Sequence, residues 1–146
     1  GLDGNAKMSK SLGNAIYISD DAKTVQRKVM SMYTDPNHIH VEDPGQIEGN
    51  TVFTYLDVFD PDKDQVAELK EQYQTGGLGD VKIKRYLNQV LENELAPIRE
   101  RREKYAQDID SVYEMLEEGS KKANEKANET LKQVRDAIGL NYFENR

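Results

Sequence analysis

Two lysines near the start of the sequence have the residue type and the spacing of a phosphate clamp. Lys7 and Lys10 lie three residues apart in the run Lys-Met-Ser-Lys-Ser, and glycines flank this run at Gly4 and Gly13. A lysine carries a compact ammonium charge on a flexible stem, which suits a polyphosphate that has to be bound and then released. The run therefore predicts a mobile loop that binds the phosphates of a ligand.

The segments that follow this loop are predicted to be mainly helical. Residues 1–15 are polar and glycine-rich and predict a loop, whereas residues 15–18 predict either a short strand or a packed turn. A helix is expected over residues 20–33, because Ser19 can cap it and Asp20 and Asp21 would follow in its first turn. The apolar residues of this helix recur at helical spacing and are Ala22, Val25, Val29 and Met32.

Further helices are predicted along the rest of the chain. Residues 51–59 form an apolar stretch, and residues 64–74 predict an amphipathic helix. A helix that opens at Asp80 is expected to continue to Gln107 with a kink at Pro97. A short helix is expected over 109–118, and a last helix starts at Gly119-Ser120 and ends at a Gly139 cap. Each of the three longer helices has an apolar stripe. It consists of Val66, Leu69 and Tyr73 in residues 64–74; of Val81, Tyr86, Val90, Leu91 and Leu95 in the helix that opens at Asp80; and of Ala123, Ala127, Leu131, Val134 and Ile138 in the last helix.

Composition limits the classes of protein that fit this chain. Its 146 residues suffice for one domain, or for one domain and the edge of another. A net charge of −7 argues against a protein that coats nucleic acid without specificity. The sequence has no cysteine, which fits a reducing compartment, and it has no apolar run that could span a membrane or act as a signal peptide. We therefore expect a cytoplasmic protein without a membrane contact.

Basic residues are concentrated between residues 82 and 104, where seven bases stand against four acids. A basic helix on an acidic protein is the first place to expect a nucleic-acid contact. The competing interpretation is a solvated helix face with pairs of Glu and Arg. His38 and His40 are expected to be surface residues of a loop rather than metal ligands, because no third ligand lies near them, and no metal site is predicted.

Four segments of the sequence resemble the bacterial tryptophanyl-tRNA synthetases, a family of class I aminoacyl-tRNA synthetases. The run at 7–11 matches the signature loop of the class, and residues 3–16 match the flanks seen in the tryptophanyl enzymes. Segments 48–59, 76–84 and 97–102 are similar to later parts of the same family, in order and at sensible spacing. The related tyrosyl enzymes vary the two middle positions of the loop and lack this downstream series.

The resemblance covers essentially the whole chain but lacks one element of the class. The other ATP motif, a His-Ile-Gly-His-type tetrapeptide after the first strand of a Rossmann fold, is absent from the sequence. We therefore identify the chain as resembling the C-terminal fragment of a bacterial-type tryptophanyl-tRNA synthetase. The implied fold is mainly α, with a helical, bundle-like anticodon-binding domain preceded by the phosphate-clamp loop of a missing Rossmann catalytic domain.

The resemblance implies an enzyme that activates tryptophan with ATP and transfers it to its tRNA. Lys10 is then expected to stabilise the charge on the leaving phosphates, with Lys7 assisting, and residues 7–11 are expected to bind ATP. Hydroxyl groups of Ser9 and Ser11, and the backbone N–H groups around them, could donate to phosphate, while Met8 would seat the loop. Gly4 and Gly13 are plausible hinges. Mg²⁺ is expected on the phosphates in the full enzyme, with no cofactor tightly bound in this fragment.

The same resemblance implies three parts and a set of partners. Residues 1–18 would be the edge of the catalytic domain, 19–118 the helical tRNA-binding domain, and 119–146 a C-terminal helix that packs on the missing catalytic domain. The full enzyme is expected to be a homodimer, and the fragment a monomer that is inactive alone. Candidates for binding the anticodon region of tRNA are Arg99, Arg101, Arg102, Lys104 and Tyr105.

Two other interpretations remain open at this point. The chain could come from a tyrosyl or another class I synthetase. It could also be a non-enzymatic helical RNA-binding module that carries the Lys-Met-Ser-Lys-Ser run by chance.

Overall fold

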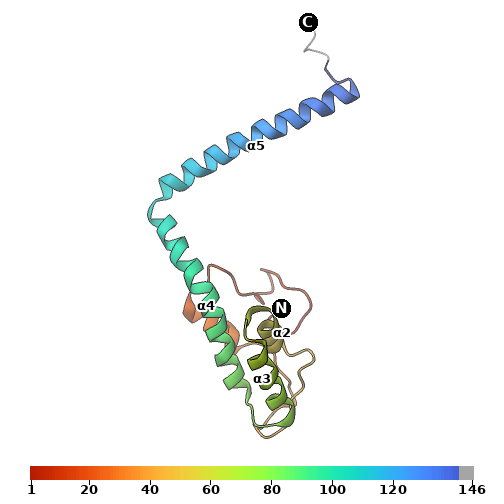
Figure 1. Cartoon of the computed structure of the whole chain (residues 1–146), viewed down its shortest axis with the longest axis vertical. Helices are drawn as coiled ribbons and strands as arrows, with labels where there is room; N and C mark the ends of the chain where they lie inside the picture. The colour runs from red at the N-terminus through yellow and green to blue at the C-terminus, as the bar shows by residue number, and fades with distance from the viewer. Residues whose placement is uncertain (142–146) are drawn as a thin grey trace. The chain divides into compact units, whose positions relative to one another are not determined.

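The computed structural model describes residues 1–141, which form helices joined by irregular segments (Figure 1). The helices in chain order are α1 (Ala22–Met30), α2 (Thr51–Phe59), α3 (Lys63–Thr75), α4 (Asp80–Gln107) and α5 (Ile109–Ile138). The predicted mainly α fold is confirmed. No strand occurs between residues 1 and 141, so the strand alternative for residues 15–18 is wrong. None of these helices is long and apolar enough to cross a membrane.

The chain divides into two compact units, and the division falls inside α4. Unit 1 comprises Gly1–Arg101 and contains α1, α2, α3 and most of α4. Unit 2 comprises Arg102–Arg146, of which residues 142–146 lie outside the described part. The last five residues of the predicted segment 119–146 therefore have no structural account.

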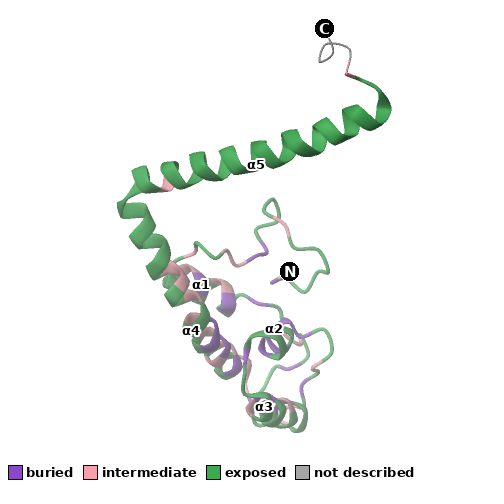
Figure 2. Ribbon diagram, turned by 45° about the horizontal axis from the view of Figure 1, so that its top comes forward, coloured by how far each residue is buried: buried purple, intermediate pink, exposed green. Residues whose placement is uncertain are grey.

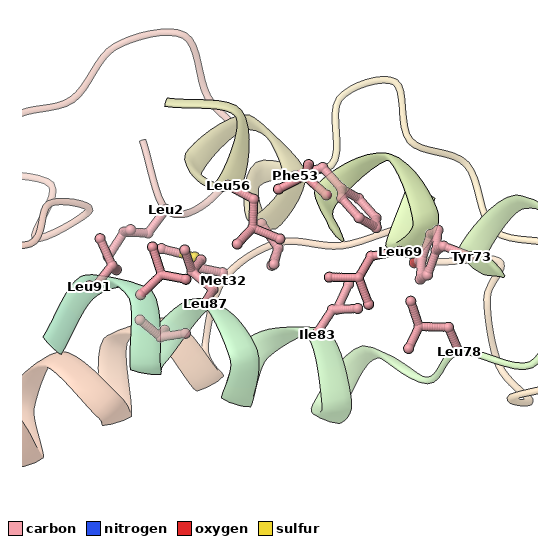
Figure 3. Close-up of a cluster of buried hydrophobic side chains, with 14 of the residues drawn as sticks. Leu2, Met32, Phe53, Leu56, Leu69, Tyr73, Leu78, Ile83, Leu87 and Leu91 are labelled. Carbon is pink, nitrogen blue, oxygen red and sulfur yellow. The ribbon is translucent and has the colours of Figure 1, made fainter. Parts of the chain in front are cut away.

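Unit 1 has a hydrophobic core that draws on all of its helices. In Figure 3, Leu56 and Phe53 of α2 face Ile83 and Leu87 of α4 across the cluster. Leu2 also lies in this core, so the start of the chain is packed against the helices. The buried core residues are Leu2, Val25, Val29, Met32, Val52, Phe53, Leu56, Val66, Leu69, Tyr73, Leu78, Ile83, Leu87, Val90 and Leu91. Burial of large apolar side chains at this density is what stabilises a helical unit of this size.

The first helix is shorter than predicted. Asp21 caps α1 by accepting a hydrogen bond from Thr24 N–H at 2.6 Å, so the cap is two residues later than the predicted Ser19. Asp20 cannot enter the helix, because its carboxylate accepts from Tyr17 N–H at 2.9 Å and pairs with Lys28 at 2.5 Å. Val25 and Val29 of the predicted stripe are buried in α1, and Met32 is buried just beyond its end, but Ala22 is exposed, so that member of the stripe is wrong.

The predictions for α3 and α4 hold in their main features. Val66, Leu69 and Tyr73 of α3 are buried, and α4 continues through Pro97 to Gln107. One member of the predicted α4 stripe is wrong, because Val81 is 49% exposed. Ile83 and Leu87 take the inward positions instead, which keeps the 3.6-residue period of the buried face.

A polar cluster at the start of α4 corrects the prediction for His38. Asp80 accepts hydrogen bonds from the hydroxyls of Tyr73 (2.9 Å) and Thr34 (2.5 Å), and its Oδ1 lies 3.1 Å from His38 Nδ1. The His38 side chain is only 2% exposed and packs on the Tyr73 ring, so it is a buried residue and not a surface one. His40 is exposed as expected. Burial and the Asp80 carboxylate both raise the pKa of the Tyr73 hydroxyl.

The last helix is continuous where a break was predicted. We expected one helix over 109–118 and another from Gly119, but α5 runs through Gly119 from Ile109 to Ile138. Ion pairs join Glu117 to Lys121 (2.7 Å) and Glu118 to Lys122 (2.6 Å) around this glycine. One glycine costs a helix only about 1 kcal/mol relative to alanine, which the surrounding strong helix formers offset. The αL cap predicted at Gly139 is confirmed by a φ of 71°.

Unit 2 does not bury the apolar stripe of α5. Figure 2 shows this helix exposed along nearly its whole length, and none of its residues is buried. Leu131, Val134 and Ile138 are 43%, 47% and 60% exposed. The stripe therefore has no partner within the described residues of unit 2.

Candidate functional site

The loop that carries Lys7 and Lys10 is closed at its base. Leu2 N–H donates to the Asn14 carbonyl at 2.9 Å, and Tyr33 N–H donates to the Leu2 carbonyl at 2.8 Å. Because the Leu2 side chain is buried in the core, both ends of the loop are fixed to unit 1. The two lysines thus project from an anchored loop.

The interior of the loop is occupied by the side chain of Asn14, which is 5% exposed. Its Oδ1 accepts a hydrogen bond from Ser9 N–H at 2.9 Å, and its Nδ2 donates to the Lys7 carbonyl at 2.9 Å. Nδ2 also lies 3.0 and 3.1 Å from the two carboxylate oxygens of Asp3. One side chain therefore joins three separate points of the loop.

Lys7 and Lys10 are both exposed to solvent. Within residues 1–141, neither ammonium is paired with a carboxylate, so both charges are available to an anion. Met8 lies between them and is 48% exposed. The arrangement fits a cationic loop that can meet a polyphosphate from the solvent side.

Part of the donor set that we expected for phosphate is used inside the loop. Ser9 N–H is bound to Asn14, Gly13 N–H donates to the Lys10 carbonyl at 3.1 Å, and Leu12 N–H donates to Ser9 Oγ at 3.3 Å. The hydroxyls of Ser9 and Ser11 lie 3.2 Å apart and share a hydrogen bond. In this conformation the ammonium groups, rather than these backbone N–H groups, are the available donors.

Met8 lies on the edge of an apolar groove of about 480 Å³. The groove is lined by residues from the loop, α2 and α4, among them Met8, Ile16, Ile18, Val58, Phe59 and Leu95. Met8 therefore lines an apolar surface, and about half of it remains exposed.

The two predicted hinge glycines both have left-handed backbone conformations. Gly4 has a φ of 80° and Gly13 a φ of 64°, which L side chains rarely adopt. A Cβ on Gly4 would also lie 2.9 Å from the Tyr33 ring, whereas Gly13 faces open space. Gly4 is thus required by packing as well as by conformation.

The carboxylate of Asp3, which lies within the loop, is favoured in its charged form. Hydrogen bonds from Asn5 and then from Asn14 lower the pKa of Asp3 below its usual range. Both Asp3 oxygens are used in these contacts. Among residues 1–141 no group of three His, Cys, Asp or Glu side chains could hold a metal ion.

The predicted tRNA-binding residues all lie on α4 but differ in their surroundings. Arg99 is half-buried and pairs with Glu92, seven residues earlier on the same helix. Arg101, Arg102, Lys104 and Tyr105 are exposed, Tyr105 by 57%. Since the division between the units falls after Arg101, Arg99 and Arg101 belong to unit 1 and the other three residues to unit 2.

A comparison with protein-family models matches residues 1–96 to the tRNA synthetases of class I (W and Y). The chain belongs to this family. The match occupies the N-terminal end of the chain, and so it does not bear out the expectation of a C-terminal fragment. The anchored lysine loop, α1, α2, α3 and the first part of α4 all lie within the matched residues.

Curated relatives are consistent with this family. The tryptophan–tRNA ligase of Streptococcus pyogenes serotype M3 is 67% identical over 145 residues, which is 98% of this chain and 43% of that protein. That of Streptococcus pneumoniae serotype 4 is 63% identical over the same share of this chain. The chain thus spans about two fifths of the length of the curated relatives it matches.

Solved structures give the same relationship in three dimensions. The tryptophanyl-tRNA synthetase of Campylobacter jejuni, complexed with ADP and tryptophan, matches with a TM-score of 0.79 and 32% identity. The match covers 95% of this chain and 42% of that one. This chain therefore shares its fold with a tryptophanyl enzyme over nearly all of its length.

Sequence reasoning missed two residues that organise this part of the molecule. The sequence alone gave Asn14 no role, and it gave Asp80 only the start of a helix. A signal for Asn14 was present, since Asn is a residue that satisfies local backbone groups through its side chain amide. No local signal identified Asp80, whose partners Thr34 and His38 lie 46 and 42 residues away.

Proposed function

We propose that this chain is part of a tryptophan–tRNA ligase and supplies its ATP-binding loop and a tRNA-binding helical domain. The observation that carries the proposal is the 67% identity to such a ligase over 98% of the chain, with the anchored lysine loop inside the aligned segment. The rest of the ligase, about half its length or more, would supply the tryptophan and nucleotide pockets.

In the proposed reaction, the tryptophan carboxylate attacks the α-phosphorus of ATP and pyrophosphate leaves. Negative charge then grows on the phosphate oxygens, and an ammonium that reaches them as the loop closes stabilises the transition state more than the ground state. Lys10 is our candidate for this catalytic role and Lys7 its assistant, because both are exposed and unpaired within the described residues. Ser9, Ser11 and Met8 complete the ATP-binding loop.

Magnesium would enter this reaction with the phosphates of ATP. The chain itself does not fit a magnesium site, since both oxygens of Asp3 are occupied and the described residues contain no cluster of metal ligands. We therefore assign no step to a metal held by this chain.

We further propose that residues 1–18 form the edge of the catalytic domain and 19–118 the domain that binds the anticodon region of tRNA. Residues 119–146 would pack on the rest of the enzyme, which agrees with the uncovered stripe of α5. Arg101 and Arg102 are the candidates for tRNA contacts, together with Lys104 and Tyr105. Arg99 is a weaker candidate, because its guanidinium is already paired with Glu92.

The remaining proposals concern assembly. We expect the full enzyme to be a cytoplasmic homodimer and the isolated chain to be an inactive monomer. Because the sequence has no His-Ile-Gly-His-type motif to hold a nucleotide opposite the loop, exchange of pyrophosphate with ATP should not occur in the isolated chain.

The proposal can be tested with a chimera of the Streptococcus pyogenes ligase, in which the aligned segment is replaced by this chain. The chimera should catalyse ATP–pyrophosphate exchange that depends on tryptophan and not on tyrosine. The isolated chain, assayed at the same concentration, should show no exchange. The unmodified streptococcal ligase is the matched control.

Three outcomes would contradict the proposal in different ways. A folded but inactive chimera would remove the chain from the ligases. Exchange driven by tyrosine would favour a tyrosyl enzyme. Exchange by the isolated chain would show that no further half is needed.

A further inference from the structure

We propose that Asn14 is the positioning residue of the ATP-binding loop, holding the segment between Lys7 and Lys10 in the shape that presents both ammonium groups. This inference deepens the proposed function and rests on it. It assigns a role to a residue that contacts no phosphate itself.

The geometry requires an amide at this position. Asn14 accepts one hydrogen bond, from Ser9 N–H, and donates to the Lys7 carbonyl and to Asp3. A carboxamide has one acceptor oxygen and two N–H donors, so it can satisfy all three partners at once. A carboxylate in its place would face the Lys7 carbonyl and the Asp3 carboxylate with no proton to donate.

The hydrogen bonds of Asn14 to the Lys7 carbonyl and to Ser9 N–H, which we call the Asn14 crosslink, begin at the first lysine and end one residue before the second. Lys7 is bound through its own carbonyl, and Ser9, bound through its N–H, directly precedes Lys10. Beyond Lys10 the chain is held by Gly13 N–H, which donates to the Lys10 carbonyl at 3.1 Å. The backbone on both sides of the two lysines is therefore fixed, although their side chains are free to move.

Two further contacts stabilise the crosslink. The Asp3 carboxylate accepts from Asn14 Nδ2, and Leu2 N–H donates to the Asn14 carbonyl at the base of the loop. Asn14 is 5% exposed, so water cannot readily replace its partners. A loop that must close on phosphate gains rate from such preorganisation, because a displacement of about 1 Å in a catalytic group can cost about 10²-fold.

Asn5 provides a matched control within the same loop. Its Nδ2 donates to Asp3 Oδ2 at 2.8 Å, so it shares a residue type and a partner with Asn14. No hydrogen bond joins it to Ser9 N–H or to the Lys7 carbonyl, whose partner is Asn14. Asn5→Ala thus perturbs Asp3 without removing the crosslink.

The first measurement tests the crosslink in the 146-residue chain. Amide hydrogen exchange of Ser9 should become about 10-fold faster or more in Asn14→Ala and stay within about 2-fold of wild type in Asn5→Ala. Asn14→Leu, which keeps the branched shape and removes the acceptor as well as the donors, serves as the second variant if Asn14→Ala is poorly folded. Unchanged Ser9 exchange in Asn14→Ala or in Asn14→Leu would overturn the inference.

The second measurement tests the role in catalysis, with the chimera described above. Asn14→Ala and Asn14→Asp should lower kcat for ATP–pyrophosphate exchange by about 10- to 100-fold. The KM for tryptophan should not change, so the loss falls on kcat alone, which a merely structural role would not predict. Asn5→Ala should keep kcat within about 2-fold of the unsubstituted chimera.

The outcomes separate this inference from the proposed function. An active chimera whose kcat is unaffected by Asn14→Ala leaves the ligase assignment intact and refutes the positioning role. A chimera that is inactive without any substitution refutes the ligase assignment. In that case the positioning role of Asn14 in catalysis is refuted with it.

Discussion

Replacement of Asp80 by alanine should destabilise unit 1 strongly, even though Asp80 lies at the edge of the core. Its carboxylate accepts from the Tyr73 and Thr34 hydroxyls and contacts His38 Nδ1. These partners come from the connector before α2 and from α3, so Asp80 joins three segments of the chain. Asp80→Ala removes all of these contacts without altering the apolar core.

The magnitude follows from the burial of the partners. Tyr73 is fully buried and the His38 side chain is 2% exposed, so two buried polar groups lose their partner. Each such group costs about 1–3 kcal/mol when it is left unsatisfied. The Asp80 side chain is itself 25% exposed, so water can replace part of the loss, and we expect a total of about 2–4 kcal/mol. This is a large share of the roughly 5–15 kcal/mol that stabilises a typical protein.

The assay is urea unfolding followed through the methyl resonance of Ile83, which reports on the unit 1 core and not on α5. Asp57→Ala is the control, because Asp57 is 50% exposed and pairs with Lys70 on the surface. It should cost no more than about 1 kcal/mol. The reasoning would be refuted if Asp80→Ala cost no more than Asp57→Ala.

A double-mutant cycle sharpens this test. Tyr73→Phe removes only the hydroxyl and should cost about 1–2 kcal/mol, since that hydroxyl donates to a charged group. Combined with Asp80→Ala, the loss should fall short of the sum by about 1 kcal/mol, because both changes delete one shared hydrogen bond. Simple additivity would show that the contact contributes nothing to folding.

Further predictions concern the lysine loop, the basic part of α4 and the long helix. In the chimera, Lys10→Ala should lower the rate of tryptophan adenylation by about 10²-fold or more, as measured by ATP–pyrophosphate exchange, and an unchanged rate would exclude the assigned role. Arg101→Glu with Arg102→Glu should weaken tRNA binding by about 10-fold or more in a filter-binding assay, whereas intact affinity would remove these residues from the interface. Gly119→Ala should stabilise α5 by about 0.5–1 kcal/mol in thermal melts at 222 nm, because an added Cβ meets nothing within 4 Å; a destabilised helix would contradict this expectation.

The sequence was a good guide wherever a feature depends on neighbours within one or two helical turns. The buried stripes of α1 and α3, the passage of α4 through Pro97 and the Gly139 cap follow from local spacing and backbone preference. Errors arose where two local preferences compete. Gly119 favours a break, but the charged residues around it favour a helix, and their paired side chains prevail.

The lysine loop shows the same limit at a candidate site. Residue type and spacing indicated the Lys7–Lys10 clamp, and the resemblance of several segments indicated the family. They could not show that Ser9 N–H is already bound, since this depends on Asn14 folding back across the loop. The hydrogen-bonding capacity of a loop is thus known only when the path of its backbone is known.

By itself, the sequence determined most of the helices, the resemblance to the family and the two cationic residues of the loop, because each is encoded in residues close together in the chain. The tertiary structure alone decided that Asn14 crosslinks the loop, that His38 is buried, and that Asp80 joins residues 42 and 46 positions away. The physical reason is that a buried polar group must find its partner wherever the folded chain brings one. That choice depends on the packing of α1 to α4 around a common core and not on any local pattern.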